Sequence, residues 1–176
     1  MKGNRGNSLG RNQIVSSLDL GRPGTYLLAL RLPEARAVEV GRLGQVNLSA
    51  GHYAYVGSAF GSGGLGARLR HHLGRSERPH WHIDYLRRAA DLAQIWASFA
   101  AERREHAWAQ LLCQCAEAAP AAKGFGSSDC NCHTHLFRWA AAPSISVFRH
   151  LVRTGFPDGA KVHPVAPDLL RQRRRP

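Results

Sequence analysis

The chain contains few lysines, few acidic residues and no long apolar segment. Its 24 basic residues include only three lysines, and 12 acidic residues leave a formal net charge of +12. No apolar run approaches the roughly 20 residues that a membrane-spanning helix requires. The first 12 residues are polar and glycine-rich, and they lack the apolar segment of a signal peptide. These absences predict a cytoplasmic protein without a membrane partner.

The rest of the composition is that of a folded, basic protein. Hydrophobic residues make up 44% of the 176 residues, which favours a packed domain over a disordered chain. A strongly positive surface attracts polyanions by releasing their counterions, so nucleic acid is the expected partner. The excess of arginine over lysine suits bidentate contacts with phosphate. A GC-rich genome also raises arginine, alanine and glycine together, and this alternative weakens the argument from charge alone.

The four cysteines form two Cys-x-Cys pairs, Cys113 with Cys115 and Cys130 with Cys132. In a cytoplasmic chain such residues are free thiols or metal ligands rather than disulfides. The second pair is followed by His135, which suggests zinc, but structural zinc sites commonly have two to four residues between the cysteines. The first pair would point to opposite sides of a helix and could not complete the site. We therefore expect packed thiols rather than a structural zinc ion.

Hydrophobic periodicity predicts an α+β fold. Apolar residues alternate along residues 26–32, as in a strand with one buried face. We expect a small, mainly antiparallel, three-stranded central sheet flanked by helices. The expected strands are residues 26–32, 37–40, 52–57, 92–99 and 135–139, and the expected helices are residues 65–74, a helix starting near 79, residues 102–117 and residues 144–154.

The expected domain organisation is simple. Residues 1–20 are expected to form a flexible leader, because they are polar and rich in glycine. Residues 21–155 are expected to form a single domain, and they show no internal repeats. Residues 156–176, which end in an arginine-rich run, are expected to form a basic, flexible tail.

Two tyrosine-bearing strands precede an arginine-bearing helix. The tripeptides Gly24-Thr25-Tyr26 and Tyr55-Val56-Gly57 lie on these strands, and Arg68 and His72 share one edge of the helix. Two phenols, a guanidinium and an imidazole could meet at one point, and such a cluster suits attack on phosphate by an activated water. Each residue also has a common structural explanation, since strand tyrosines pack in cores and helix arginines form surface ion pairs.

These motifs, in this order, resemble the GIY-YIG nuclease superfamily, and most closely its Uri-type branch of stand-alone domains. The resemblance covers residues 21–140. Thr25 stands where the name of the superfamily has Ile, and Ser58 stands where its excision-repair members have a basic residue. Two further blocks of the branch are present, His80–Leu86 and Gly124–Phe137.

The resemblance implies an endonuclease that hydrolyses phosphodiester bonds in DNA rather than RNA, as in DNA repair. It implies Tyr26 and Tyr55 as positioning groups for water, His72 as an assisting base and Arg68 as the phosphate clamp. It also implies Mg²⁺ or Mn²⁺ held by Glu105. The expected nucleic-acid contacts are Ser58, Arg70, His80 and His82.

Several alternatives stay open at the level of sequence. Glu102 is the second choice for the metal ligand, and Glu105 could instead serve only its helix N-terminus through the helix dipole. Asp84 is expected to pair with a neighbouring arginine. A nucleic-acid-binding module of the same fold without catalysis is the alternative function. A partner protein could supply specificity, and the sequence does not define the oligomeric state.

Overall fold

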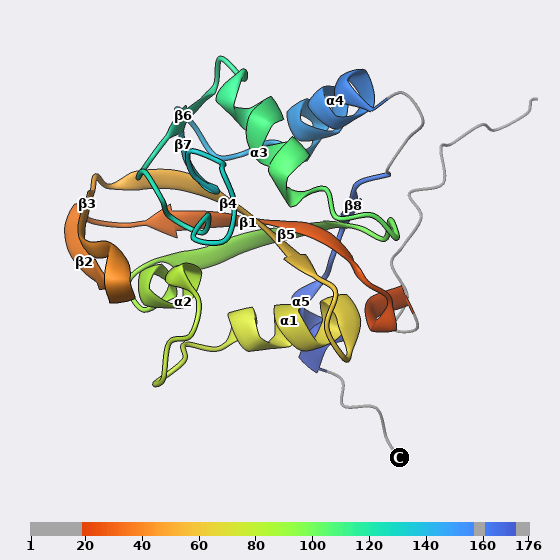
Figure 1. The fold of residues 1–176 in the computed structure, drawn as a ribbon, viewed down its shortest axis with the longest axis horizontal. Coiled ribbons are helices and arrows are strands. Elements are labelled where there is room, and N and C mark those ends of the chain that lie inside the picture. Colours follow the sequence, from red (N-terminus) through yellow and green to blue (C-terminus); the bar gives the residue numbers. More distant parts are fainter. Residues whose placement is uncertain (1–18, 157–160, 172–176) are drawn as a thin grey trace, which may run out of the picture.

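A computed structural model describes residues 19–156 and 161–171 of the chain. It forms one α+β domain around an antiparallel sheet (Figure 1). The sheet has six strands in the order β6-β7-β4-β1-β5-β8 rather than the three expected. Their bounds are β1 Gly24–Leu32, β4 Gly51–Ala59, β5 Asp91–Ser98, β6 Ala118–Pro120, β7 Leu136–Trp139 and β8 His163–Pro164.

The extra strands were difficult to predict for a physical reason. β6 and β8 have only three and two residues and each contains a proline, so neither shows a period-two pattern. A separate hairpin of β2, Arg36–Val40, and β3, Gly44–Leu48, forms a second, two-stranded sheet. The expected α+β class and the mainly antiparallel sheet with flanking helices are confirmed.

Helices cover both faces of the large sheet (Figure 1). In this view α3 and α4 lie above the sheet, and α1, α2 and α5 lie below it. None of the helices in the described part of the chain is long and apolar enough to span a bilayer. The helix bounds are α1 Gly64–Leu73, α2 His82–Arg87, α3 Glu105–Cys113, α4 Ile145–Gly155 and α5 Pro167–Arg171, with short 3₁₀ turns at Asp19–Gly21 and Gly41–Leu43.

Strand β1 contributes to two cores, one on each face of the sheet. Tyr26 and Leu28 point into the core that contains α1 and α2, together with Leu69 and Ile83. The residue between them, Leu27, packs in the other core with side chains of α3 and α4. Alternating residues of a strand point to opposite faces, so both faces of β1 are apolar. The predicted common face of Tyr26 and the leucines that follow it is confirmed.

Helix α3 begins at Glu105, three residues later than expected. The backbone N–H of Arg104 donates to Oγ1 of Thr25 at 3.1 Å, which ties the residue before the helix to β1. Glu102 lies outside the helix, and its exposed carboxylate pairs with Arg104 at 2.9 Å. The first turn of α3 is therefore fixed against the sheet, with Glu105 as its first residue.

The C-terminal segment was expected to be a tail, and part of it belongs to the folded domain. β8 pairs with β5, and α5 follows it. Val162, Val165 and Leu170 are buried. The segment extends the edge of the sheet and covers α1. Residues 1–18, 157–160 and 172–176, which include most of the expected leader and the arginine-rich end, lie outside the described residues.

Candidate functional site

A cleft of about 340 Å³ opens beside the ends of β1 and β4. Its walls come from those two strands, helix α1, the start of α2, the start of α3 and the loop before β7. Seven of the nine predicted site residues line it: Tyr26, Tyr55, Ser58, Arg68, His80, His82 and Glu105. Their sequence positions span 80 residues (105 − 26 + 1), so the fold assembles the cleft from distant segments.

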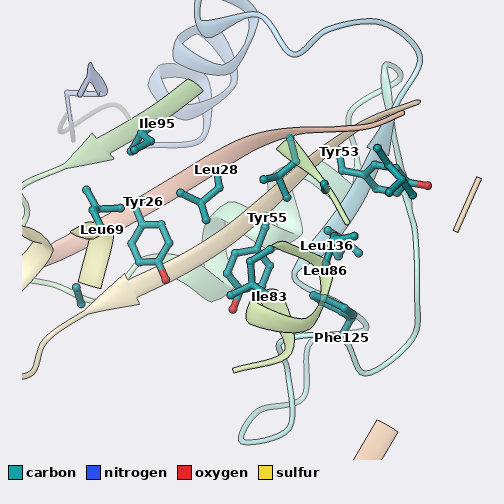
Figure 2. Close-up of a cluster of buried hydrophobic side chains, with 14 of the residues drawn as sticks. Tyr26, Leu28, Tyr53, Tyr55, Leu69, Ile83, Leu86, Ile95, Phe125 and Leu136 are labelled. Carbon is teal, nitrogen blue, oxygen red and sulfur yellow. The ribbon is translucent and has the colours of Figure 1, made fainter. Parts of the chain in front are cut away.

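The two tyrosines lie side by side on neighbouring strands. β1 and β4 are antiparallel, with Leu28 opposite Tyr55 and Tyr26 opposite Gly57. Both rings stand on the same face of the sheet, with their hydroxyls directed toward the same side (Figure 2). The hydroxyl of Tyr53 points away from this pair and donates to the carbonyl of Ser49 at 2.7 Å.

Burial keeps both phenols protonated near neutral pH. Tyr26 is 1% exposed and Tyr55 is 6% exposed. Removal from water raises the pKa of Tyr26 well above 10, although the nearby guanidinium of Arg68 lowers it in part. Burial, and then the neighbouring Tyr26, raises the pKa of Tyr55 well above its ordinary value. A neutral phenol can donate a hydrogen bond, but neither residue is a standing phenolate base.

His72 lies behind Tyr26 rather than in the cleft. Its Nε2 is 2.8 Å from the phenol oxygen of Tyr26, and its Nδ1 is 3.4 Å from Oδ1 of Asp84. A carboxylate beside Nδ1 favours the tautomer with the proton on that nitrogen, so Nε2 accepts from the Tyr26 hydroxyl. Burial lowers the pKa of His72, while Asp84 partly opposes this effect, so the ring is neutral at pH 7.

Asp84 is held by donors from several directions. Its Oδ2 accepts from the backbone N–H groups of His80 and Trp81, each at 3.0 Å, and lies 3.1 Å from Nε2 of His71. Burial alone would raise the pKa of this carboxyl, but the contact with His72 and the two backbone N–H groups hold it well below its usual value. The expectation that Asp84 pairs with an arginine was wrong. Its partners among the described residues are imidazoles and amides.

Arg68 is held beside the cleft by an aromatic ring. Its guanidinium carbon lies 3.9 Å from the centroid of Trp81, within the range of a cation–π contact. Within the described part of the chain, none of the ion pairs includes Arg68. The flat face of the guanidinium is therefore covered, and its N–H groups are available for an anion in the cleft.

Glu105 enters the cleft with one oxygen bound and one without a partner. Oε1 accepts from Oγ of Ser58 at 2.8 Å and lies 3.6 Å from a guanidinium nitrogen of Arg103. Oε2 is buried and has no hydrogen-bond partner among the described residues. A buried carboxylate oxygen in this state requires a cation or a donor, and Mg²⁺ prefers such oxygen ligands. Glu105 therefore fits a divalent cation. Glu102 is exposed and does not line the cleft.

The loop between β6 and β7 forms the wall of the cleft beside Tyr55. Gly126 has φ of +76°, and a Cβ there would lie 2.8 Å from the Tyr55 ring, so only glycine fits without a shift. Its N–H donates to Nδ1 of His82 at 2.9 Å. Burial lowers the pKa of His82, which suits a neutral ring acting as an acceptor. Asp129 and His135 of the same loop also line the cleft.

Two predicted residues occupy different places from those expected. Arg70 is exposed on α1 and does not line the cleft. His72 is 1% exposed and reaches the cleft only through Tyr26. Sequence reasoning also missed the site contacts of Trp81, Asp84 and Gly126. The sequence signal that could have revealed these contacts was the presence of the two blocks His80–Leu86 and Gly124–Phe137, because Trp81 and Asp84 lie in the first and Gly126 lies in the second.

The fold and the cleft define a small antiparallel α+β protein with a polar cleft lined by tyrosine, arginine and glutamate. The chain belongs to the family described as Domain of unknown function DUF123, which it matches over residues 25–154. This span contains every residue that lines the cleft. No curated protein and no solved structure showed significant similarity to the chain.

Proposed function

We propose that this protein is a metal-dependent endonuclease of the GIY-YIG type that hydrolyses phosphodiester bonds in DNA. The observation that carries the proposal is the convergence, in one cleft, of two neutral phenols, a guanidinium and a carboxylate. Among the described residues, this guanidinium is in none of the ion pairs, and one oxygen of this carboxylate has no hydrogen-bond partner. The order of the motifs along the chain adds support from sequence. The family match is compatible with the proposal, but its description names no activity.

Arg68 binds the scissile phosphate in this proposal. Its N–H groups donate to two non-bridging oxygens. The stacked Trp81 ring already restricts the orientation of the guanidinium, so less conformational entropy is lost when the phosphate binds. The positive charge also opposes the extra negative charge that develops on these oxygens in the transition state. Tyr55, a neutral phenol, donates a hydrogen bond to the reacting phosphate group.

Tyr26 transfers the proton of the attacking water in this mechanism. Since its phenol is not ionised at rest, it accepts the proton of water as it passes its own proton to Nε2 of His72, 2.8 Å away. The imidazole is neutral beforehand and becomes an imidazolium, and Asp84 stabilises the new positive charge from 3.4 Å. The hydroxide oxygen forms the new P–O bond, and the bond to the leaving oxygen breaks.

Glu105 would hold Mg²⁺ or Mn²⁺ through Oε2, while the hydroxyl of Ser58 holds Oε1, the other oxygen of the carboxylate, by a hydrogen bond. When bound, the ion supplies positive charge near the phosphate and the leaving oxygen. One protein carboxylate is sufficient for Mg²⁺, which commonly retains several waters and completes its shell with substrate oxygens.

The test is a cleavage assay on the full chain. Plasmid, single-stranded and branched DNA, with matched RNA, are incubated in buffer with and without Mg²⁺ or Mn²⁺. We expect DNA cleavage only with the metal, reduced by at least ~10²-fold in Arg68→Ala and in Glu105→Ala. Arg70→Ala is the matched control, since this exposed arginine lies on the same helix outside the cleft.

Two results would contradict the proposed function. Cleavage that neither Arg68→Ala nor Glu105→Ala reduces would show that the activity does not come from this cleft. Tight, salt-sensitive binding with no turnover on any substrate would favour the alternative of a nucleic-acid-binding module with the same fold.

A further inference from the structure

A second cluster of ligand-type side chains lies where α3 meets the loop before β7. It contains His106 from the first turn of α3 and Cys130, Cys132 and His135 from the loop. One ligand atom from each of the four residues lies within 4.8 Å of all the others. Sγ of Cys132 is 3.4 Å from Nδ1 of His106, and Sγ of Cys130 is 3.7 Å from Nε2 of His135.

The two sulfur–nitrogen separations match edges of a tetrahedral zinc site. Zinc binds thiolate at about 2.3 Å and imidazole at about 2.0–2.1 Å, which places neighbouring ligand atoms about 3.3–3.8 Å apart. The two sulfur–nitrogen distances given above, 3.4 Å and 3.7 Å, fall in this range. The four atoms are thus already gathered around one point, and small movements would complete the coordination shell.

We propose that His106, Cys130, Cys132 and His135 bind one Zn²⁺ ion as a closed structural site. Two thiolates and two imidazoles are the ligands that zinc prefers, whereas Mg²⁺ prefers oxygen. Four protein ligands leave no position for water or substrate, so the ion holds structure and performs no chemistry. The expectation of packed thiols considered the cysteines and the histidine after them, and it did not consider His106 on α3.

The zinc ion would hold one wall of the cleft in place. The loop that contributes three of its ligands also contributes Gly126, Ser128 and Asp129 to the cleft. On the other side of His106, Nε2 lies 4.0 Å from Oε1 of Glu105. A ligating histidine commonly directs its second nitrogen toward a carboxylate, which orients both groups. The ion would therefore connect the loop to the residue that carries the free carboxylate oxygen.

The test begins with metal binding by the full chain under reducing conditions. The apo protein is prepared with a chelator, Zn²⁺ is added back, excess metal is removed and the metal content is measured. We expect about one zinc per chain and a higher thermal unfolding temperature than that of the apo protein. Replacement by Co²⁺ should give the visible absorption of a tetrahedral site and the thiolate-to-cobalt charge-transfer bands. A wild-type chain that retains less than about a tenth of an equivalent of zinc would overturn the proposal.

Variants then identify the ligands. Cys132→Ser and His106→Ala should lower the bound zinc to below about a tenth of an equivalent, while Cys113→Ser should retain about one. Cys113 is the matched control, because it is an exposed free cysteine beside the same loop but outside the four-residue cluster. Equal zinc content in all three variants, or bound cobalt without thiolate bands in the wild type, would also overturn the proposal. The wild-type cobalt spectrum decides the question even if a variant fails to fold.

Discussion

Gly57 on β4 lies directly opposite Tyr26 on the neighbouring strand β1, and the phenol ring of Tyr26 occupies the space where a side chain at position 57 would be. A Cβ built on Gly57 would lie 2.5 Å from both the oxygen and the adjacent ring carbon of Tyr26. The glycine of the second tripeptide therefore determines where the tyrosine of the first one points. The two tripeptides are two halves of one packing arrangement.

Gly57→Ala is expected to destabilise the protein and to reduce cleavage. The added methyl would occupy the position of the Tyr26 ring and would push that ring away from His72. Overpacking of this kind in a core lowers the free energy of unfolding by about 1–3 kcal/mol. Urea unfolding measures the change in stability. Gly61→Ala is the matched control, because a Cβ there meets nothing within 4 Å, and its stability should change by less than about 0.5 kcal/mol. Equal effects of the two substitutions would contradict the packing argument.

Tyr26→Phe should abolish most activity while the fold persists. The ring remains, but the proton path to His72 is lost, and we expect a decrease in cleavage rate of about 10²-fold or more. The unfolding free energy should decrease by about 1–3 kcal/mol, because Nε2 of His72 loses its partner in a buried site. Tyr53→Phe removes a hydroxyl from the same face of the sheet, outside the cleft, and should cleave at the wild-type rate. A Tyr26→Phe protein with full activity would exclude the proposed relay.

The central part of the fold could be predicted from the sequence because its signals are local. The period-two pattern of β1 and the leucines of α1 each reveal a buried face within one element. Helix α1 was expected at residues 65–74 and is found at Gly64–Leu73. The positions of Tyr26, Tyr55 and Arg68 at one cleft followed from this local reading together with the order of the motifs.

The contacts that arrange the site depend on packing between elements and could not be predicted. Asp84 meets His72 only because α2 packs beside α1, and nothing in the segment around Asp84 indicates that partner. The choice between Glu102 and Glu105 depended on where α3 begins. That point is fixed by the hydrogen bond from the backbone N–H of Arg104 to Thr25, which lies far away in the sequence on β1. His106 joins Cys130 from 24 residues away (130 − 106), which no local spacing rule detects.

Ser58→Ala should raise the Mg²⁺ concentration that cleavage requires rather than abolish cleavage. Without the 2.8 Å hydrogen bond from Ser58, the Glu105 carboxylate can turn away from the cleft, and the loss of such a supporting contact commonly costs about 10-fold in metal affinity. The measurement is a titration of the cleavage rate with Mg²⁺, in which the half-saturating concentration should rise. Ser62→Ala, at an exposed position of the next loop, is the control and should give the wild-type titration. An unchanged half-saturating concentration in Ser58→Ala would show that Glu105 keeps its position without Ser58.

Lowering the pH from 7 to 5 should reduce the free energy of unfolding, with His72 as one contributor. Burial holds the pKa of His72 below its ordinary value of 6.5 in the folded state, so the unfolded chain binds more protons in this range. The contribution of the neutral ring is complete above pH 6.5 and decreases as the pH falls toward the folded pKa. Asp84 does not add to this change, because its lowered pKa affects stability only as the pH falls below about 4, near the ordinary value of 3.8.

Urea unfolding at pH 5, 6 and 7 measures how steeply the free energy of unfolding rises with pH. This slope should be smaller for His72→Gln than for the wild type, by up to about 1.4 kcal/mol per pH unit. Equal slopes would mean that folding does not lower the pKa of His72. A larger slope for His72→Gln than for the wild type would mean that the folded protein holds His72 protonated, and the imidazole could then not accept the proton of Tyr26.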